Sequence, residues 1–153
     1  MRNRLEFEIW QKPIPQKRHR HTKSGHTFDP SYKEKKAFFK ESIIYAPYKP
    51  IEGGVGVELL FFMQRPKSHY GTGKNAEKLK PQAPYEHIKT PDTDNLVKFV
   101  LDALGTEQIF FKDDRQIVSV KARKLYANRR ANTRTYVCLY AIDEEEIQRW
   151  NLN

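Results

Sequence analysis

Residues 90–104 read TPDTDNLVKFVLDAL, and the rest of the chain is organised around this stretch. The ring of Pro91 disfavours helical backbone at Thr90, so a helix must begin after this pair. From Leu96 onward the apolar side chains recur with helical spacing, at Leu96, Phe99, Val100, Ala103 and Leu104. The stretch therefore predicts an extended turn that leads into an amphipathic helix, whose apolar stripe faces a core.

Acidic side chains gather at the start of this helix. Asp94 occupies the position expected of an N-cap, and Asp92 points the same way two residues earlier in extended chain. Asn95, Lys98 and Asp102 fall on the polar side of the helix. Two carboxylates and an ammonium group thus converge near one helix end. A purely structural interpretation also exists, in which Asp94 caps the helix and Lys98 pairs with Asp102 on a solvated face.

The distribution of charge favours a functional interpretation of these acids. Residues 1–91 carry 18 Lys and Arg against nine acids, whereas residues 92–114 carry six acids against two bases. Residues 115–142 then hold seven bases and no acid. A divalent metal ion beside a polyanion would explain a concentrated acidic segment inside a basic chain.

Length and composition limit the class of protein. A chain of 153 residues forms one domain with a substantial core. The net charge of +9 favours a polyanionic partner, nucleic acid before a membrane. No apolar run approaches the ~20 residues that span a bilayer, and the N-terminus lacks the apolar core of a signal peptide. The single Cys138 suits a reducing cytoplasm, so we expect a cytoplasmic protein that does not bind membranes.

The chain in order predicts an α+β fold. Strands are expected at residues 5–10, 55–63, 117–126 and 134–141, and helices from Asp29-Pro30 to about Tyr45, after the Asp94 N-cap to Leu104, and after Asp143. Gly105 is expected to end the central helix in the C′ position. In strand 117–126, Val118, Val120 and Ala122 are expected to face the core. We expect one domain over residues 1–153, a mixed β-sheet with helices packed on it, in the order β-α-β-(long loop)-α-β-β.

Three basic segments are candidates for contact with nucleic acid. The segment after Pro13 and Pro15 is stiff and extended, so it can separate phosphate-binding donors. Residues 65–91 lack any period and predict a mobile basic loop beside the active site. The polar side of strand 117–126 is basic. The residues expected to bind nucleic acid are Lys17, Arg18, Arg20, Lys67, Lys74, Lys121 and Arg123.

The acids suit metal-assisted hydrolysis of a phosphodiester. Mg2+, or Mn2+ in its place, activates water and neutralises charge on the scissile phosphate. Mg2+ takes one or two protein carboxylates and keeps several waters. Asp92, Asp94 and one of Asp113 and Asp114 would supply that number. Lys98, one turn into the helix, could hold the phosphate or stabilise the leaving oxyanion.

The same residues resemble a known family. The pattern PDxDNLxKxxxDAL over residues 91–104, followed by DDxQI over residues 113–117, resembles the signature of RusA-type Holliday junction resolvases. The basic segment PxPxKR at residues 13–18 resembles that family's N-terminal region. The resemblance spans most of residues 5–140. The central helix-and-acid motif is its specific part.

The resemblance implies a function and a set of site residues. It implies a homodimeric, Mg2+-dependent endonuclease, often carried by prophages, that acts in DNA recombination and repair. Such an enzyme resolves Holliday junctions, which are four-way DNA, by paired symmetric cleavage. Carried over by position, the metal ligands would be Asp92, Asp94 and Asp114, with Asp113 as the alternate, and Lys98 would be the catalytic lysine. Residues 65–91 form a longer connection than the shortest family members have.

Two other functions compete with this one. A noncatalytic nucleic-acid-binding module could use basic loops and stack bases on Tyr70 and Tyr85. That function does not explain why acids cluster where a phosphate should bind. A metal-dependent nuclease that acts on another DNA structure would need the same chemistry, and only the motif resemblance favours four-way junctions over it.

Overall fold

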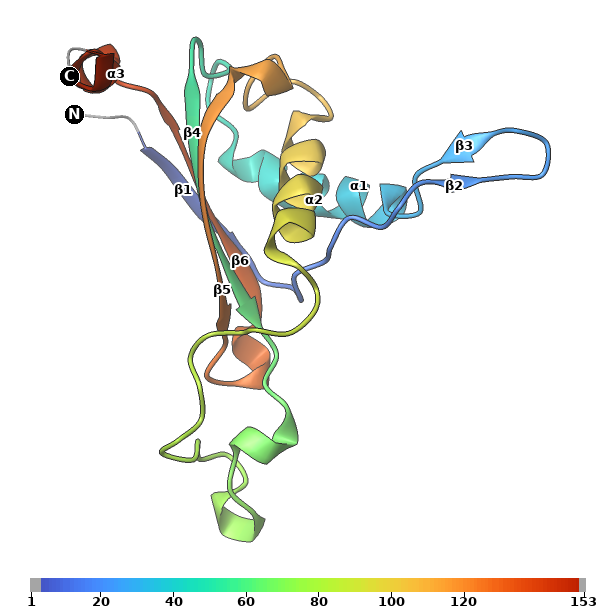
Figure 1. Cartoon of the computed structure of the whole chain (residues 1–153), viewed down its shortest axis with the longest axis vertical. Coiled ribbons are helices and arrows are strands. Elements are labelled where there is room, and N and C mark those ends of the chain that lie inside the picture. Colours follow the sequence, from blue (N-terminus) through green and yellow to red (C-terminus); the bar gives the residue numbers. More distant parts are fainter. Residues whose placement is uncertain (1–3, 152–153) are drawn as a thin grey trace.

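The computed structural model describes residues 4–151, excluding the side chain of Trp150, and contains one four-stranded sheet in the order β1-β6-β4-β5 (Figure 1). The strands are β1 (Arg4–Ile9), β4 (Val55–Met63), β5 (Ile117–Tyr126) and β6 (Arg134–Ala141). β6 pairs antiparallel with both β1 and β4, whereas β4 and β5 are parallel. The sheet is therefore mixed, as the sequence predicts.

Two helices cover one face of this sheet, α1 (Tyr32–Ser42) and α2 (Thr93–Gly105) (Figure 1). Burial along β4 alternates, because every second side chain from Val55 to Met63 points toward the helices. The predicted stripe of α2 is buried against that face. A third helix, α3 (Glu144–Asn151), follows β6 at the C-terminal end. The α+β class and the predicted order of elements are confirmed.

The direction of α2 decides where its two ends lie. β4, α2 and β5 form a crossover between two parallel strands, so α2 runs opposite to both of them (Figure 1). Its N-terminus consequently lies near the end of β5, and its C-terminus lies near the beginning of β5. The acids that precede and follow the helix therefore lie at its two opposite ends.

A hairpin arm, residues 17–28, projects away from the body of the protein (Figure 1). It contains the two-residue strands β2 (Arg20–His21) and β3 (Thr27–Phe28), and Gly25 takes a positive φ of 84° in its turn. The sequence did not predict these strands, because they are too short for alternation and bury no side chain. The remaining elements are single 3-10 turns at Ile43–Tyr45, Lys67–His69, Gly73–Asn75, Asp114–Gln116 and Arg130–Asn132.

Residues 64–92 form an extension below the sheet, attached to the end of β5. The buried Arg65 donates from Nε to the carbonyl oxygen of Ala127 at 2.9 Å and from Nη1 to that of Pro84 at 2.6 Å. The backbone N–H of Tyr126 donates to the oxygen of Tyr85 at 2.8 Å. These bonds attach both the first and the last part of the extension to the end of β5.

Four local predictions were wrong. α1 begins at Tyr32 after an N-cap at Ser31, two residues later than the expected cap at Asp29. α2 begins one residue after Asp92, which takes the N-cap position, so Asp94 lies inside the first turn. Gly105 is the last residue of α2 and does not take the positive φ of a C′ glycine. Val118 and Val120 are exposed instead of buried, because β5 is an edge strand. Within residues 4–151 no helix has the length and apolar character needed to cross a membrane.

Candidate active site

Asp92 and Asp94 lie exposed at the start of α2. Asp92 has the extended backbone of an N-cap, yet its carboxylate makes no capping hydrogen bond. Asp94 accepts one bond, from the backbone N–H of Asn95 at 2.9 Å. In residues 4–151 neither carboxylate forms an ion pair. Both acids lie at the positive end of the helix dipole, and their carboxylates keep free oxygen lone pairs.

Lys124 fixes the backbone just before these acids. From β5, its Nζ donates to the carbonyl oxygen of Pro91 at 2.6 Å and also to that of Lys89. The Thr90–Pro91 peptide bond is cis. A single ammonium group thus ties the segment that enters α2 to the sheet and sets the position of Asp92.

A chain of alternating charges joins α1 to the exposed side of α2. Lys35 is buried, and its Nζ lies 2.7 Å from Asp29 Oδ2 and 3.0 Å from Asp102 Oδ2. Asp102 in turn lies 3.5 Å from Nζ of Lys98. Burial alone would raise the pKa of Asp29, but hydrogen bonds from Lys35, Ser31 and Gln16 outweigh it and lower the pKa to about 2. Asp102 is therefore a carboxylate held between a buried and an exposed ammonium.

Asp114 lies at the opposite end of α2. A Cβ atom built on Gly105 would be only 2.8 Å from Oδ1 of Asp114, so the missing side chain makes room for this carboxylate. Among the described residues Asp114 has no ion pair and no side-chain hydrogen bond. The helix C-terminus is the negative end of the dipole, an unfavourable place for a carboxylate without a cation.

The neighbouring Asp113 faces another way. Its carboxylate accepts hydrogen bonds from the backbone N–H of Arg115 at 2.8 Å and from the Arg115 guanidinium at 2.8 and 3.0 Å. These bonds lower the pKa of Asp113 to about 2. It lines a separate depression with Gly53 and Gly54. The acidic pair is thus divided, with Asp113 engaged in the local turn and Asp114 available.

A groove of about 500 Å³ runs beside α2 and contains most of these groups. Its charged lining residues are Asp94, Lys98, Asp102 and Asp114, and between them lie Val97, Leu101 and Ile117. At ~1.5 Å of rise per residue, Asp94 and Gly105 are about 16 Å apart along the helix axis. Asp94 and Asp114 are therefore brought to one groove but to its two ends. Across residues 4–151, no three side chains of His, Cys, Asp or Glu lie close enough to hold a metal ion.

The N-terminal acids alone match the ligand preference of Mg2+. This ion needs only one or two protein carboxylates and completes its octahedron with water. Asp92 and Asp94 offer exposed oxygens with no competing cation among the described residues. Asp114 is too distant to share that ion within one subunit, because ligand oxygens on one Mg2+ lie within about 4 Å of each other.

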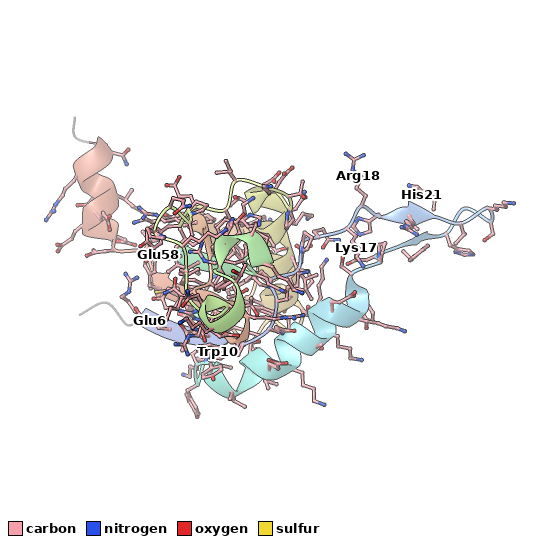
Figure 2. The ribbon with its side chains drawn as sticks, turned by 90° about the horizontal axis from the view of Figure 1, so that it is seen from below. Glu6, Trp10, Lys17, Arg18, His21 and Glu58 are labelled. Carbon is pink, nitrogen blue, oxygen red and sulfur yellow. The ribbon has the colours of Figure 1, made fainter. Side chains whose placement is uncertain are left out.

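The first group of predicted DNA contacts lies on the hairpin arm. Figure 2 shows Arg18 pointing away from the body where the arm leaves it, with His21 farther out. Arg18 and Arg20 are exposed, whereas Lys17 lies 3.5 Å from Oε1 of Glu34. The arm contains no Asp or Glu between residues 17 and 28, so it presents positive charge at a distance from the groove.

The other predicted contacts occupy two further surfaces. Lys67 and Lys74 are exposed on the extension. Lys121 and Arg123 lie on the face of the sheet that α1 and α2 leave open, beside Glu58. The structure therefore does not bring the seven basic residues together, and Lys121 and Arg123 face away from the groove.

Sequence reasoning missed three residues that support the site. Lys124 shares the helix-facing side of β5 with Ala122, and Lys35 shares the buried side of α1 with Phe38 and Phe39. Each lysine occupies a sequence position at which the repeat of its helix or strand predicts an apolar side chain, and this exception could have identified both. Gly105 was assigned to helix termination, and nothing in the sequence indicates its contact with the Asp114 carboxylate.

Comparison with known proteins assigns the family. The model of the family described as endodeoxyribonuclease RusA matches residues 11–139. An uncharacterized protein of Bacillus subtilis (strain 168), YqaN, is 31% identical over 131 residues, which cover 80% of this chain and 88% of that protein. The matched region contains the arm, the extension, the groove, all of β4 and β5, and most of β6. The chain belongs to the RusA endodeoxyribonuclease family.

Proposed function

We propose that this protein is a structure-selective endonuclease that resolves Holliday junctions in DNA recombination and repair. It would use Mg2+, or Mn2+, and cut four-way DNA by paired symmetric cleavage. One observation carries the proposal: in a basic chain of an endodeoxyribonuclease family, a groove beside α2 gathers Asp94, Lys98 and Asp114 with no cation paired to either acid among the described residues.

Each residue then has a defined role. Asp92 and Asp94 would hold the divalent ion, which supplies activated water and neutralises charge on the scissile phosphate. Lys98, half-exposed one turn into α2, would contact the phosphate and stabilise the oxyanion that leaves. Asp102 would position Lys98 through their 3.5 Å ion pair. Lys35 keeps Asp102 in place from the buried side.

The position of Asp114 supports a homodimer. Resolution needs two cuts, and a two-fold dimer supplies two equal sites. If the α2 helices of two subunits lie antiparallel along their grooves, Asp114 of one subunit meets Asp94 of the other around a metal ion. In the middle, Lys98 of each subunit faces Asp102 of the other. At the centre of such a dimer, Lys98 and Asp102 of opposite subunits would attract each other. At each end, a metal ion would offset the repulsion between Asp94 and Asp114.

The direct test compares labelled four-way junction with linear duplex of the same sequences, in Mg2+ and in EDTA. We expect paired nicks in the junction with Mg2+ only, and no cleavage by Asp94→Asn, which should still bind the junction. Loss of one negative charge beside the DNA backbone favours binding rather than opposing it. Lys112→Ala serves as a control, because it changes an exposed charge outside the groove.

The remaining outcomes identify the competing functions. Equal cutting of duplex and junction would assign a nuclease that acts on another DNA structure. Tight binding without cleavage in Mg2+ or Mn2+ would assign a noncatalytic binding module. A full loss of folding in Asp94→Asn would favour a structural role for that carboxylate.

A further inference from the structure

A second cavity lies outside the groove, at the foot of the extension. It has a volume of about 760 Å³ and lies between residues 64–80 and the turn that joins β5 to β6. Its charged lining residues are Arg65, Lys67, Lys80, Arg129, Arg130 and Glu77. We call this cavity the basic pocket. Five cations and one carboxylate surround it.

The two walls of the basic pocket are joined by hydrogen bonds. Tyr70 donates its hydroxyl to the carbonyl oxygen of Asn128 at 2.8 Å, which connects the extension to the β5–β6 turn. At the base, the N–H of Ala127 donates to the oxygen of Met63 at 2.8 Å, and Arg65 donates to Ala127. The pocket is thus built from two segments that are distant in the sequence, residues 64–80 and 129–130, and its shape does not depend on one free loop.

The positive charge of the basic pocket is not neutralised within the described chain. In residues 4–151, the side chains of Lys67, Lys80, Arg129 and Arg130 form no ion pair. Arg65 is only 5% exposed, and its Nη2 has no hydrogen-bond partner. The guanidinium bonds two carbonyl oxygens and lies over the Tyr126 ring at 5.1 Å, so it supplies fixed positive charge in the wall of the pocket.

The pKa of His69, which lies beside Arg65, is affected by the same positive charges. Burial lowers the pKa of His69, and the nearby cations Arg65, Lys89 and Lys80 lower it further. His69 also lies edge-on to Tyr126, with ring centroids 4.9 Å apart. Positive potential therefore extends from the pocket to the end of β5.

We propose that the basic pocket binds a backbone phosphate of the DNA substrate, away from the bond that is cut. Guanidinium groups match phosphate oxygens in charge and geometry, and lysines add mobile donors. The returning chain at residues 85–87 follows the end of β5 and leads directly to Asp92. The extension that carries the pocket therefore adjoins the N-terminal end of the groove. The identity of the ligand rests on the proposed function, whereas the existence of an anion site does not.

Salt-dependent binding tests the proposal. The variant Arg129→Ala/Arg130→Ala removes two exposed pocket cations, and Lys36→Ala/Lys40→Ala removes two exposed cations from α1. Binding of fluorescent junction is measured in EDTA by anisotropy over a salt series. One lost phosphate contact should make the log–log slope shallower by about 0.9 in the pocket variant only. Equal slopes in the wild type and both variants would overturn the proposal.

Lysine footprinting locates the contact without any variant. Wild-type protein is acetylated with and without junction in EDTA, and modification is read by mass spectrometry. We expect DNA to protect Lys67 and Lys80 but not Lys36 and Lys40. Unchanged acetylation of Lys67 and Lys80 in the complex would exclude DNA from the pocket. Because neither assay needs cleavage, a protein that protects these lysines but does not cut would overturn the enzyme proposal alone.

Discussion

Mixing two inactive variants should restore cleavage if each active site draws residues from both subunits. The variants are Asp94→Asn and Asp114→Asn, each of which should be inactive alone. Within one subunit Asp94 and Gly105, beside which Asp114 lies, are about 16 Å apart along the α2 axis. Oxygens bound to one Mg2+ lie within about 4 Å of each other, so Asp114 cannot reach the ion of its own subunit without unfolding the helix.

The expected yield follows from counting sites. Random exchange makes roughly half of the dimers mixed, and each mixed dimer has one site with both acids intact, so roughly a quarter of wild-type sites return. One working site per dimer should nick a cruciform plasmid once, leaving a relaxed circle. The matched control mixes wild type with the double variant Asp94→Asn/Asp114→Asn, whose mixed dimer has no intact shared site.

The reverse result would refute the reasoning. If each subunit holds a complete site, the first mixture stays inactive and the second mixture nicks. Disulfide crosslinking tests the same point without measuring activity. It uses the variant Asp94→Cys/Asp114→Cys with Cys138→Ser. Shared sites predict a disulfide between subunits and a covalent dimer on a denaturing gel, since a disulfide needs Cα atoms about 4.4–6.8 Å apart. Neither single-cysteine variant should form that Asp94-to-Asp114 link.

Three further predictions concern supporting residues. Gly105→Ala should raise stability by about 0.5–1 kcal/mol, yet slow cleavage roughly ten- to hundredfold, because the new Cβ displaces the Asp114 carboxylate. Thermal melting and junction cleavage measure the two effects, and normal cleavage would refute the contact. Lys124→Met should cost about 1.5–3 kcal/mol in urea unfolding and lower cleavage, with partial rescue by Lys124→Arg. Unchanged unfolding and cleavage would show that the hydrogen bonds from Lys124 to Lys89 and Pro91 do not position the start of α2. Burial lowers the pKa of both His69 and His87, so the folded state resists their protonation and stability should fall as pH drops below 6.5. Replacing both histidines with Gln should flatten that pH dependence of the melting temperature, and an equally steep fall would refute the assignment.

The sequence predicted the elements whose pattern is set by the core. β5 and β6 have the expected bounds, and α2 has the expected buried stripe, because each presents one face to the same apolar layer. The start of α2 was misplaced by two residues. Asp92 and Asp94 are both good N-caps, and sequence alone does not reveal that Lys124 holds the backbone at Pro91.

The candidate site was predictable in its residue types and not in its geometry. The acids and Lys98 could be named as candidates from their spacing, since carboxylates are the ligands that Mg2+ prefers. Their separation depends on α2 running opposite to β4 and β5, which is a property of the whole fold. Likewise, Asp114 differs from Asp113 only through Arg115 and Gly105, contacts that no local pattern encodes.

The extension enters the fold after Met63 and returns at Asp92, both at the end of the sheet where β4 and β5 finish. An insertion at such a point can change in length while α2, the groove and the strand register stay as they are. The entropic penalty is small, about 0.6 kcal/mol for each doubling of loop length. If the extension contacts DNA as proposed, evolution can alter the binding of flanking DNA without changing the catalytic residues. Hybrid proteins that exchange only residues 64–91 with a relative should inherit the donor's DNA preference and keep the recipient's cutting activity.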